Sequence, residues 1–262
     1  MKKAILYAVV FVLIQLVVGG TVQGAWSIVT KRPLAEMPAT FYIITMVASN
    51  IATIVVFLYL KWAEVSRNYI RSRPWAVIFW CCVAACGAII PSTWLQENMP
   101  ELPNIVEQQF DMILKDRWGY FAIGLLAPIG EELVFRGAIL RALLRPTPHP
   151  SPFTLHPWIA IALSALLFAI IHANPAQMPH AFLIGLLLGW MYYRTGSIIP
   201  SVTYHWVNNT IAYIMYNLYP DPSLKLADIF GDSQRTVLSA LFFSLLILLP
   251  AIYQLNLRLR KV

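Results

Sequence analysis

The chain has 262 residues, of which 59% are hydrophobic and only 12% are charged, and its formal net charge is +7. Soluble globular domains carry about a quarter charged residues. This composition, together with a mean hydropathy of +0.65, excludes a soluble globular protein and predicts that the bilayer is its solvent.

The apolar residues are collected into runs that approach the roughly 20 residues needed to cross a bilayer as a helix. Eight such spans are predicted, at 5–22, 41–60, 75–90, 119–140, 158–172, 181–193, 198–218 and 237–253. The first follows Lys2 and Lys3 as a signal peptide would, but its length favours a retained anchor. We therefore expect an all-α integral membrane protein, a bundle of about eight transmembrane helices that uses residues 1–262 as a single polytopic domain.

The distribution of charge predicts how the chain lies in the membrane, because Lys and Arg near helix ends are retained on the cytoplasmic side. With eight spans, one side collects Lys2, Lys3, Lys61, Arg67, Arg71, Arg73, Arg141, Arg145, Arg194, Arg258, Arg260 and Lys261. The other side collects Lys31, Arg32, Lys115, Arg117, Lys225 and Arg235. Nine acids share this second side, namely Glu36, Glu97, Glu101, Glu107, Asp111, Asp116, Asp221, Asp228 and Asp232, whereas only Glu64 accompanies the first group.

Twelve cations against six predict that both termini are cytoplasmic, in the plasma (inner) membrane. The positive charge needs no nucleic-acid partner, because anionic lipid headgroups attract the cytoplasmic Lys and Arg.

Two patterns predict local structure. The segment 91–117 carries an amphipathic stretch that we expect on the membrane surface. Gly185 and Gly189 form a small-xxx-small pair, which predicts a close approach of two helices and no more.

The fourth span carries ionisable residues, which are costly within a bilayer. Glu132 and Arg136 are four residues apart, in the order that favours an acid-base pair on a helix. Glu131 is rotated about 100° from Glu132 by the helical period, so it has no partner within its own helix and is a candidate general base. The alternative is that the three residues form a structural polar network between helices.

The fifth and seventh spans supply further polar residues. Phe168 and His172 are four apart, so the ring is expected to lie beside the imidazole and to shield it from lipid. His205 and Asn209 share a helix face at the same spacing, with Asn208 as the alternative neighbour, and an imidazole beside an amide donor suits an oxyanion. Each residue taken singly is also consistent with interhelical hydrogen bonding.

The depth of these residues in the membrane limits whether they meet. Glu131 and His172 lie at similar distances from the ends of their spans, but His205 lies too shallow if its helix begins at Ile198. An extended segment over 195–200, before Pro200, would bring His205 and Asn209 to the same depth. Irregular backbone within the bilayer must line a cavity or be buried in protein, and hydrolysis needs such a cavity.

The motifs Glu131-Glu132-x-x-x-Arg136, Phe168-x-x-x-His172 and His205-x-x-x-Asn209, in this order on separate spans, resemble those of the CPBP family. That family comprises the CAAX prenyl endopeptidases and the bacteriocin-processing or abortive-infection-type proteins. The resemblance covers residues 119–213, a CPBP-like catalytic core on the fourth, fifth and seventh spans.

The resemblance implies an intramembrane endopeptidase that hydrolyses a peptide bond of a membrane-associated protein or peptide. By the same resemblance, Glu131 activates the water, His172 helps to position it, and His205 with Asn209 stabilises the oxyanion. Glu132, Arg136 and Phe168 are supporting residues. We expect the cavity to face the cytoplasm, and neither the substrate nor any prenyl group on it can be read from the sequence.

Family members have been described both as metalloproteases and as metal-independent glutamate proteases. Glu131, His172 and His205 would supply a two-His, one-carboxylate set for a divalent metal such as zinc. The HExxH helix of common zinc peptidases is absent from the sequence, so direct activation of water by Glu131, without a cofactor, is favoured.

Two other classes of function compete with the protease. The first is a non-catalytic membrane scaffold or a bacteriocin-immunity protein, in which the same residues only hold helices together. The second is a transporter, for which polar, broken helices are expected in both halves of the chain. The transporter ranks last, because the polar residues within the spans all lie in the second half.

Overall fold

The computed structural model describes residues 1–144, 155–221, 224–231 and 233–260, and within these ranges the protein is helical and contains no strand. The helices are α1 (Lys2–Thr30), α2 (Ala39–Tyr59), α3 (Arg67–Arg71), α4 (Trp75–Glu97), α5 (Glu107–Lys115), α6 (Ala127–Glu132), α7 (Arg141–Leu144), α8 (Pro157–Ile171), α9 (Met178–Thr195), α10 (Ile199–Leu218), α11 (Leu226–Phe230) and α12 (Gln234–Arg258). A 3₁₀ turn, η1 (Leu34–Glu36), lies between α1 and α2. The all-α fold class is thus confirmed.

Four of these helices, α1, α2, α4 and α12, are long and apolar enough to cross a membrane by length and composition alone. The other predicted spans fall on helices or helical segments that are shorter or more polar. The count of eight spans therefore stays a prediction, while the integral membrane character is supported by the four apolar helices.

The fourth predicted span is a helical rod of mixed winding. The segments η2 (Tyr120–Leu126) and η3 (Leu133–Leu140) are wound as π-helix and flank the α-helical α6. Wide π turns are frequent at functional sites, because they displace side chains from regular helical positions. Glu131 and Glu132 lie at the junction of the two windings.

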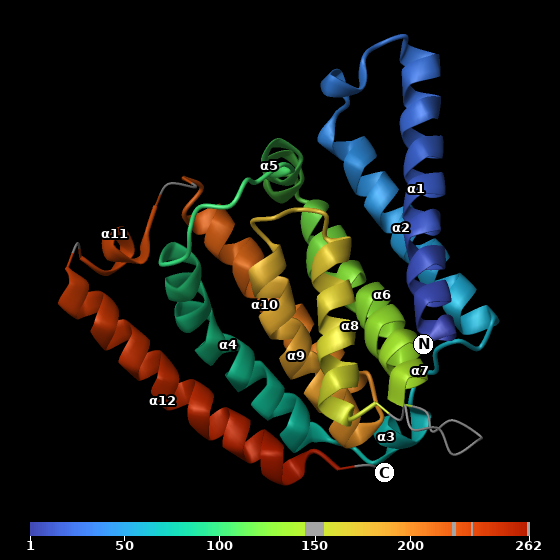
Figure 1. Cartoon of the computed structure of the whole chain (residues 1–262). Helices are drawn as coiled ribbons and strands as arrows, with labels where there is room; N and C mark the ends of the chain where they lie inside the picture. Colours follow the sequence, from blue (N-terminus) through green and yellow to red (C-terminus); the bar gives the residue numbers. More distant parts are fainter. Residues whose placement is uncertain (145–154, 222–223, 232, 261–262) are drawn as a thin grey trace.

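The long helices run roughly alongside one another (Figure 1). The residues at the two ends of the bundle differ in charge. The basic end holds both termini, α3 and α7, and carries Lys2, Lys3, Lys61, Arg67, Arg71, Arg73, Arg141, Arg194, Arg258 and Arg260. The acidic end holds α5 and α11 and carries Glu36, Glu97, Glu101, Glu107, Asp111, Asp116, Asp221 and Asp228 with six cations. Arg145, Asp232 and Lys261 lie outside the described residues.

The turn between α9 and α10 differs from its prediction. Only residues 196–198 are non-helical, and not 195–200, because Gly196 takes a left-handed φ of 67° and the Thr195 hydroxyl accepts a hydrogen bond from the Ser197 N–H at 3.1 Å. Pro200 is compatible with the first turn of α10, where no N–H donor is required. Thr195, Ser197 and Ile198 are buried, whereas Gly196 is exposed, so the turn is only partly recessed within the bundle.

Helices α8 and α9 pack at close range through the two glycines that the sequence singled out. A Cβ atom at Gly189 would lie 2.9 Å from the Ile161 side chain, and one at Gly185 would lie 2.9 Å from the Ala165 Cβ and 3.1 Å from its Cα. The predicted close approach is therefore confirmed, and it positions α8, with Phe168 and His172, against α9.

We expect Gly185→Leu to lower stability by about 1–3 kcal/mol, because the added side chain meets the backbone of Ala165 and overpacked cores are destabilised by such amounts. Thermal unfolding in detergent measures the effect. Gly20→Leu is the matched control, because no atom lies within 4 Å of a Cβ built at Gly20. An unchanged unfolding temperature for Gly185→Leu would mean that α8 and α9 do not pack through this position.

Candidate active site

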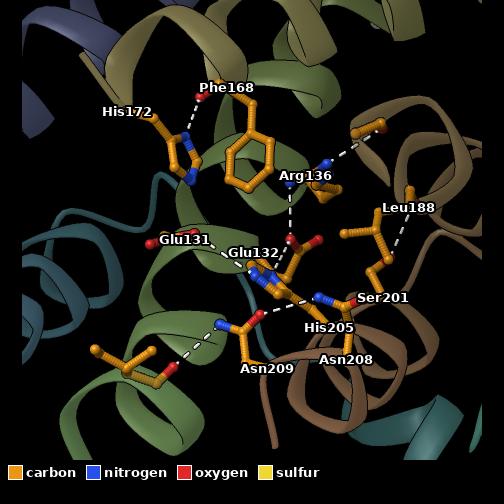
Figure 2. A network of polar contacts seen from close by, with 12 residues as sticks. Glu131, Glu132, Arg136, Phe168, His172, Leu188, Ser201, His205, Asn208 and Asn209 are labelled. Carbon is orange, nitrogen blue, oxygen red and sulfur yellow. Dashed lines mark hydrogen bonds and ion pairs between the residues drawn. The ribbon is translucent and has the colours of Figure 1, made fainter. Parts of the chain in front are cut away.

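A cavity of about 390 Å³ lies between α2, α5, the η2–α6 rod, α8, α9 and α10. Its lining includes residues from all three sequence motifs, namely Glu131, Phe168, His172, His205 and Asn209. Helices far apart in the sequence thus bring these side chains to one place (Figure 2). Glu132 and Arg136 lie behind the lining and support it.

Glu132 and Arg136 form a fully buried ion pair. Arg136 Nη1 donates to Glu132 Oε1 at 2.8 Å, and both side chains have 0% exposure, as expected from residues four apart on a helix. Arg136 also donates from Nη2 to the Gly185 carbonyl at 3.2 Å, and its guanidinium lies 4.6 Å from the centre of the Phe168 ring. The pair therefore joins the fourth span to α8 and α9.

His205 is held by Glu132 and presents its other nitrogen to Glu131. The Nδ1 atom lies 3.1 Å from Glu132 Oε1. Because an ionised carboxylate only accepts hydrogen bonds, Nδ1 carries the proton. The Nε2 atom lies 3.9 Å from Glu131 Oε2. Glu132 thus fixes both the tautomer and the direction of the ring, a contact between α6 and α10 that helical spacing does not predict.

His172 is fixed in a similar way at the end of α8. Its Nδ1 lies 2.7 Å from the Phe168 carbonyl, which only accepts, so Nδ1 is the donor and Nε2 is left for the cavity. The Phe168 ring stands edge-on between the two imidazoles, with centroids 4.7 Å from His172 and 5.9 Å from His205. The expected shielding of His172 by Phe168 is confirmed by this geometry.

Glu131 is the acid of this cluster that remains open to the cavity. Its side chain is 22% exposed, whereas that of Glu132 is 0% exposed. Within the described part of the chain its closest ionic contact is the 3.9 Å approach to His205, which is longer than a hydrogen bond. The imidazole of His172 is directed toward it (Figure 2). A water molecule held between the carboxylate and these rings would have suitable polar partners.

Asn209 and His205 do not hydrogen-bond to each other directly. Asn209 Nδ2 donates to the Ile123 carbonyl at 3.1 Å, and Asn209 Oδ1 accepts from Asn208 Nδ2 at 3.3 Å. Both asparagines line the cavity. A primary amide has two N–H donors, so Asn209 retains one beyond its bond to Ile123.

His180 is a cavity residue that the sequence reasoning missed. Its Nδ1 lies 2.7 Å from the Ser92 hydroxyl of α4, and its side chain lines both the main cavity and an adjoining chamber of about 430 Å³. His180 directly precedes the sixth predicted span, and Ser92 was placed in a loop, so neither was counted as a residue within the membrane. A histidine at the first turn of an apolar helix was the available signal.

The residues proposed for a metal do not fit one in this arrangement. Among the described residues, no group of three or more His, Cys, Asp or Glu side chains is placed to hold a metal ion. No step of the proposed reaction therefore uses a metal ion bound by Glu131, His172 and His205.

The cavity reaches the acidic end of the bundle. Beyond Glu131 it is lined by Phe110 and Leu114 of α5 and by Tyr213 and Tyr216 from the second half of α10. Tyr216 donates a hydrogen bond to Asp111, which holds α5 over this end of the cavity. The apolar side of α5 thus packs onto the bundle. The sequence predicted only that this amphipathic segment lies on the membrane surface.

The extension of the cavity toward the acidic end conflicts with one of the sequence-based expectations. The cavity extends to α5, and α5 lies at the opposite end of the bundle from the two termini (Figure 1). A cavity that faces the cytoplasm and termini that lie in the cytoplasm therefore cannot both be right. The sequence placed the candidate residues on these helices but could not establish toward which end their side chains open.

Comparison with known protein families gives one match. Residues 114–211 match the family model described as Rce1-like, "Type II CAAX prenyl endopeptidase Rce1-like". The matched segment contains every residue of the three motifs, from Glu131 to Asn209. Comparison of the chain with curated proteins and with solved structures gave no significant match.

Proposed function

We propose, from the match of residues 114–211 to the Rce1-like family model, that the protein is a CPBP-type intramembrane endopeptidase that cleaves a membrane-associated protein or peptide with water activated by Glu131. The observation that carries this proposal is the position of Glu131. Its carboxylate is open to a cavity within the bundle, and two imidazoles that are each anchored through Nδ1 lie beside it. Such a group suits general base catalysis, which requires a carboxylate within reach of the water.

In the proposed reaction Glu131 removes a proton from a bound water while the water oxygen attacks the carbonyl carbon of the substrate. His172 Nε2, which has no proton in this tautomer, accepts a hydrogen bond from the remaining hydrogen of the water. The C–N bond then breaks, and the proton held by Glu131 passes to the departing nitrogen. The carboxylic acid that forms then gives its proton to the amine, so the final products are a carboxylate and an ammonium group, and atoms and charge balance without a covalent intermediate.

The negative oxygen formed during the attack needs donors. Asn209 offers its second N–H, and His205 offers Nε2 only when the ring carries both protons, since Nδ1 donates to Glu132. Glu132 faces this ring from a fully buried position and would stabilise the imidazolium, as the acid of a catalytic triad does. In this proposal Glu132 is a positioning residue, and Arg136 pairs with its carboxylate at 2.8 Å.

The test is cleavage by the purified protein in lipid vesicles, with a library of membrane-anchored peptides and with mass spectrometry of the fragments. We expect cleavage to continue in the presence of EDTA and 1,10-phenanthroline, because direct activation of water by Glu131 needs no metal. Loss of cleavage with chelator and its recovery with added zinc would contradict the metal-free mechanism. Absence of cleavage under all conditions by folded protein would contradict the proposed function itself.

A further inference from the structure

We infer that the substrate reaches this site from the non-cytoplasmic side of the membrane, so that the scissile bond belongs to an exported or outward-facing peptide segment and not to a cytosolic tail. The inference rests on the proposed function, because only a protease has a substrate with a scissile bond. Its structural part, the side toward which the site opens, depends only on the cavity and on the distribution of charge.

The main cavity runs toward the acidic end of the bundle. From Glu131 and His205 it runs to Phe110 and Tyr216 at the acidic end. The adjoining chamber shares His180, Asn208, Ala212 and Tyr216 with the main cavity, and it continues to Asp221 and to α11. Both hollows therefore extend from the buried polar residues toward the same end of the bundle.

At the basic end of the bundle, packed protein covers the site. There Ser197, in the turn between α9 and α10, and Ser201, in the first turn of α10, are both at 0% exposure. Ser66, in the segment that leads into α3, donates a hydrogen bond to the Gly196 carbonyl of that turn at 3.4 Å. A Cβ at Gly137 would lie 3.1 Å from Ala63, which is itself buried. None of the residues that line the main cavity comes from this end.

The two ends of the bundle also differ in charge. Outside the polar site, Glu64 is the only described acid at the basic end, where it pairs with Arg141 at 2.7 Å, and ten described cations surround this end. The acidic end carries eight described acids and six cations. Retention of Lys and Arg on the cytoplasmic side then places the basic end in the cytoplasm, and the mouth of the cavity outside it.

The test measures which side of the membrane reaches the cavity. Single cysteines are introduced after Cys81, Cys82 and Cys86, which all lie in α4, have been replaced by alanine. Glu101→Cys marks the acidic end, Asn68→Cys marks the basic end, and Ala212→Cys reports on the cavity, whose two chambers meet at this residue. A membrane-impermeant maleimide is then added to right-side-out and to inverted vesicles.

We expect Glu101→Cys and Ala212→Cys to react in right-side-out vesicles and Asn68→Cys to react only in inverted ones. Reaction of Glu101→Cys only in inverted vesicles would overturn the inference. Absence of reaction at Ala212→Cys from the side that labels Glu101→Cys would overturn it as well, because the cavity would then not open there. The labelling needs no proteolysis, so its failure is distinguishable from failure of the proposed function.

Discussion

Glu131→Gln is expected to reduce peptide-bond cleavage by at least about 10²- to 10⁴-fold, the range that a general base contributes. The amide keeps the size of the side chain and its capacity to hydrogen-bond, but it cannot take a proton from water. Because Glu131 is partly exposed and has no short ionic contact, the substitution should leave the fold intact. Initial cleavage rates in vesicles and the unfolding temperature in detergent are measured together.

Glu64→Gln is the matched control for this experiment. Glu64 is also a glutamate that approaches a basic side chain, but it lies at the basic end and its side chain is 66% exposed. Its cleavage rate should equal that of the wild type. A rate for Glu131→Gln within a few fold of the wild type would rule out Glu131 as the base.

The same substitution separates the protease from the scaffold or bacteriocin-immunity protein. A residue that only joins helices can be replaced by glutamine with little loss, because the amide replaces most of the hydrogen bonds. The position of Glu131 on the cavity wall, beside the buried pair that does join helices, favours the protease. Preservation of the cellular function by Glu131→Gln would favour the scaffold.

Arg136→Met is expected to destabilise the protein by about 3–5 kcal/mol, because it leaves the fully buried Glu132 without the cation that neutralises it. The loss should exceed that of removing the methylenes alone, since Arg136 also binds the Gly185 carbonyl and lies against Phe168. Chemical unfolding in mixed micelles gives the difference. The double variant Glu132→Gln with Arg136→Met should recover part of the loss, because no unpaired charge remains.

Arg141→Met is the control for this comparison. Arg141 pairs with Glu64 at 2.7 Å, close to the 2.8 Å of the buried pair, but the Glu64 side chain is 66% exposed. Exposed ion pairs contribute only about 0–1 kcal/mol. Equal losses for Arg136→Met and Arg141→Met would contradict the central structural role given to the buried pair.

Local spacing predicted the contacts that are made within one helix. The Glu132–Arg136 pair and the Phe168–His172 contact follow from residues four apart, and the structure contains both. The pairing of Gly185 and Gly189 with α8 follows from the absence of a side chain. In each case the geometry of a single helix determines the result.

Apart from the close approach of α8 and α9, contacts between helices were beyond the reach of the sequence. The hydrogen bond of His205 to Glu132, and that of His180 to Ser92, depend on which faces of four helices meet. The π winding on both sides of Glu131 shifts those faces further. The direction of the cavity depends on the same packing, which explains why a cytoplasm-facing site was expected and a mouth at the acidic end was found.

The orientation also bears on the family match. A CAAX motif lies at the C-terminus of a cytosolic protein. Such a tail would approach from the basic end, which is the cytoplasmic end in the inferred orientation. The matched segment, residues 114–211, supplies the polar residues of the site, whereas α5, α11 and the C-terminal part of α4 shape the mouth and the adjoining chamber. We therefore expect the substrate to be selected by parts of the chain that mostly lie outside the matched segment.

The most direct test of the central claim is hydrolysis in water enriched in ¹⁸O. The purified protein is incubated in vesicles with the library of membrane-anchored peptides, and every new carboxyl terminus is examined by mass spectrometry. The account predicts fragments that carry one ¹⁸O atom with the wild type and none with Glu131→Gln. Intact peptides after incubation with folded wild-type protein, or equal labelling by Glu131→Gln, would contradict it.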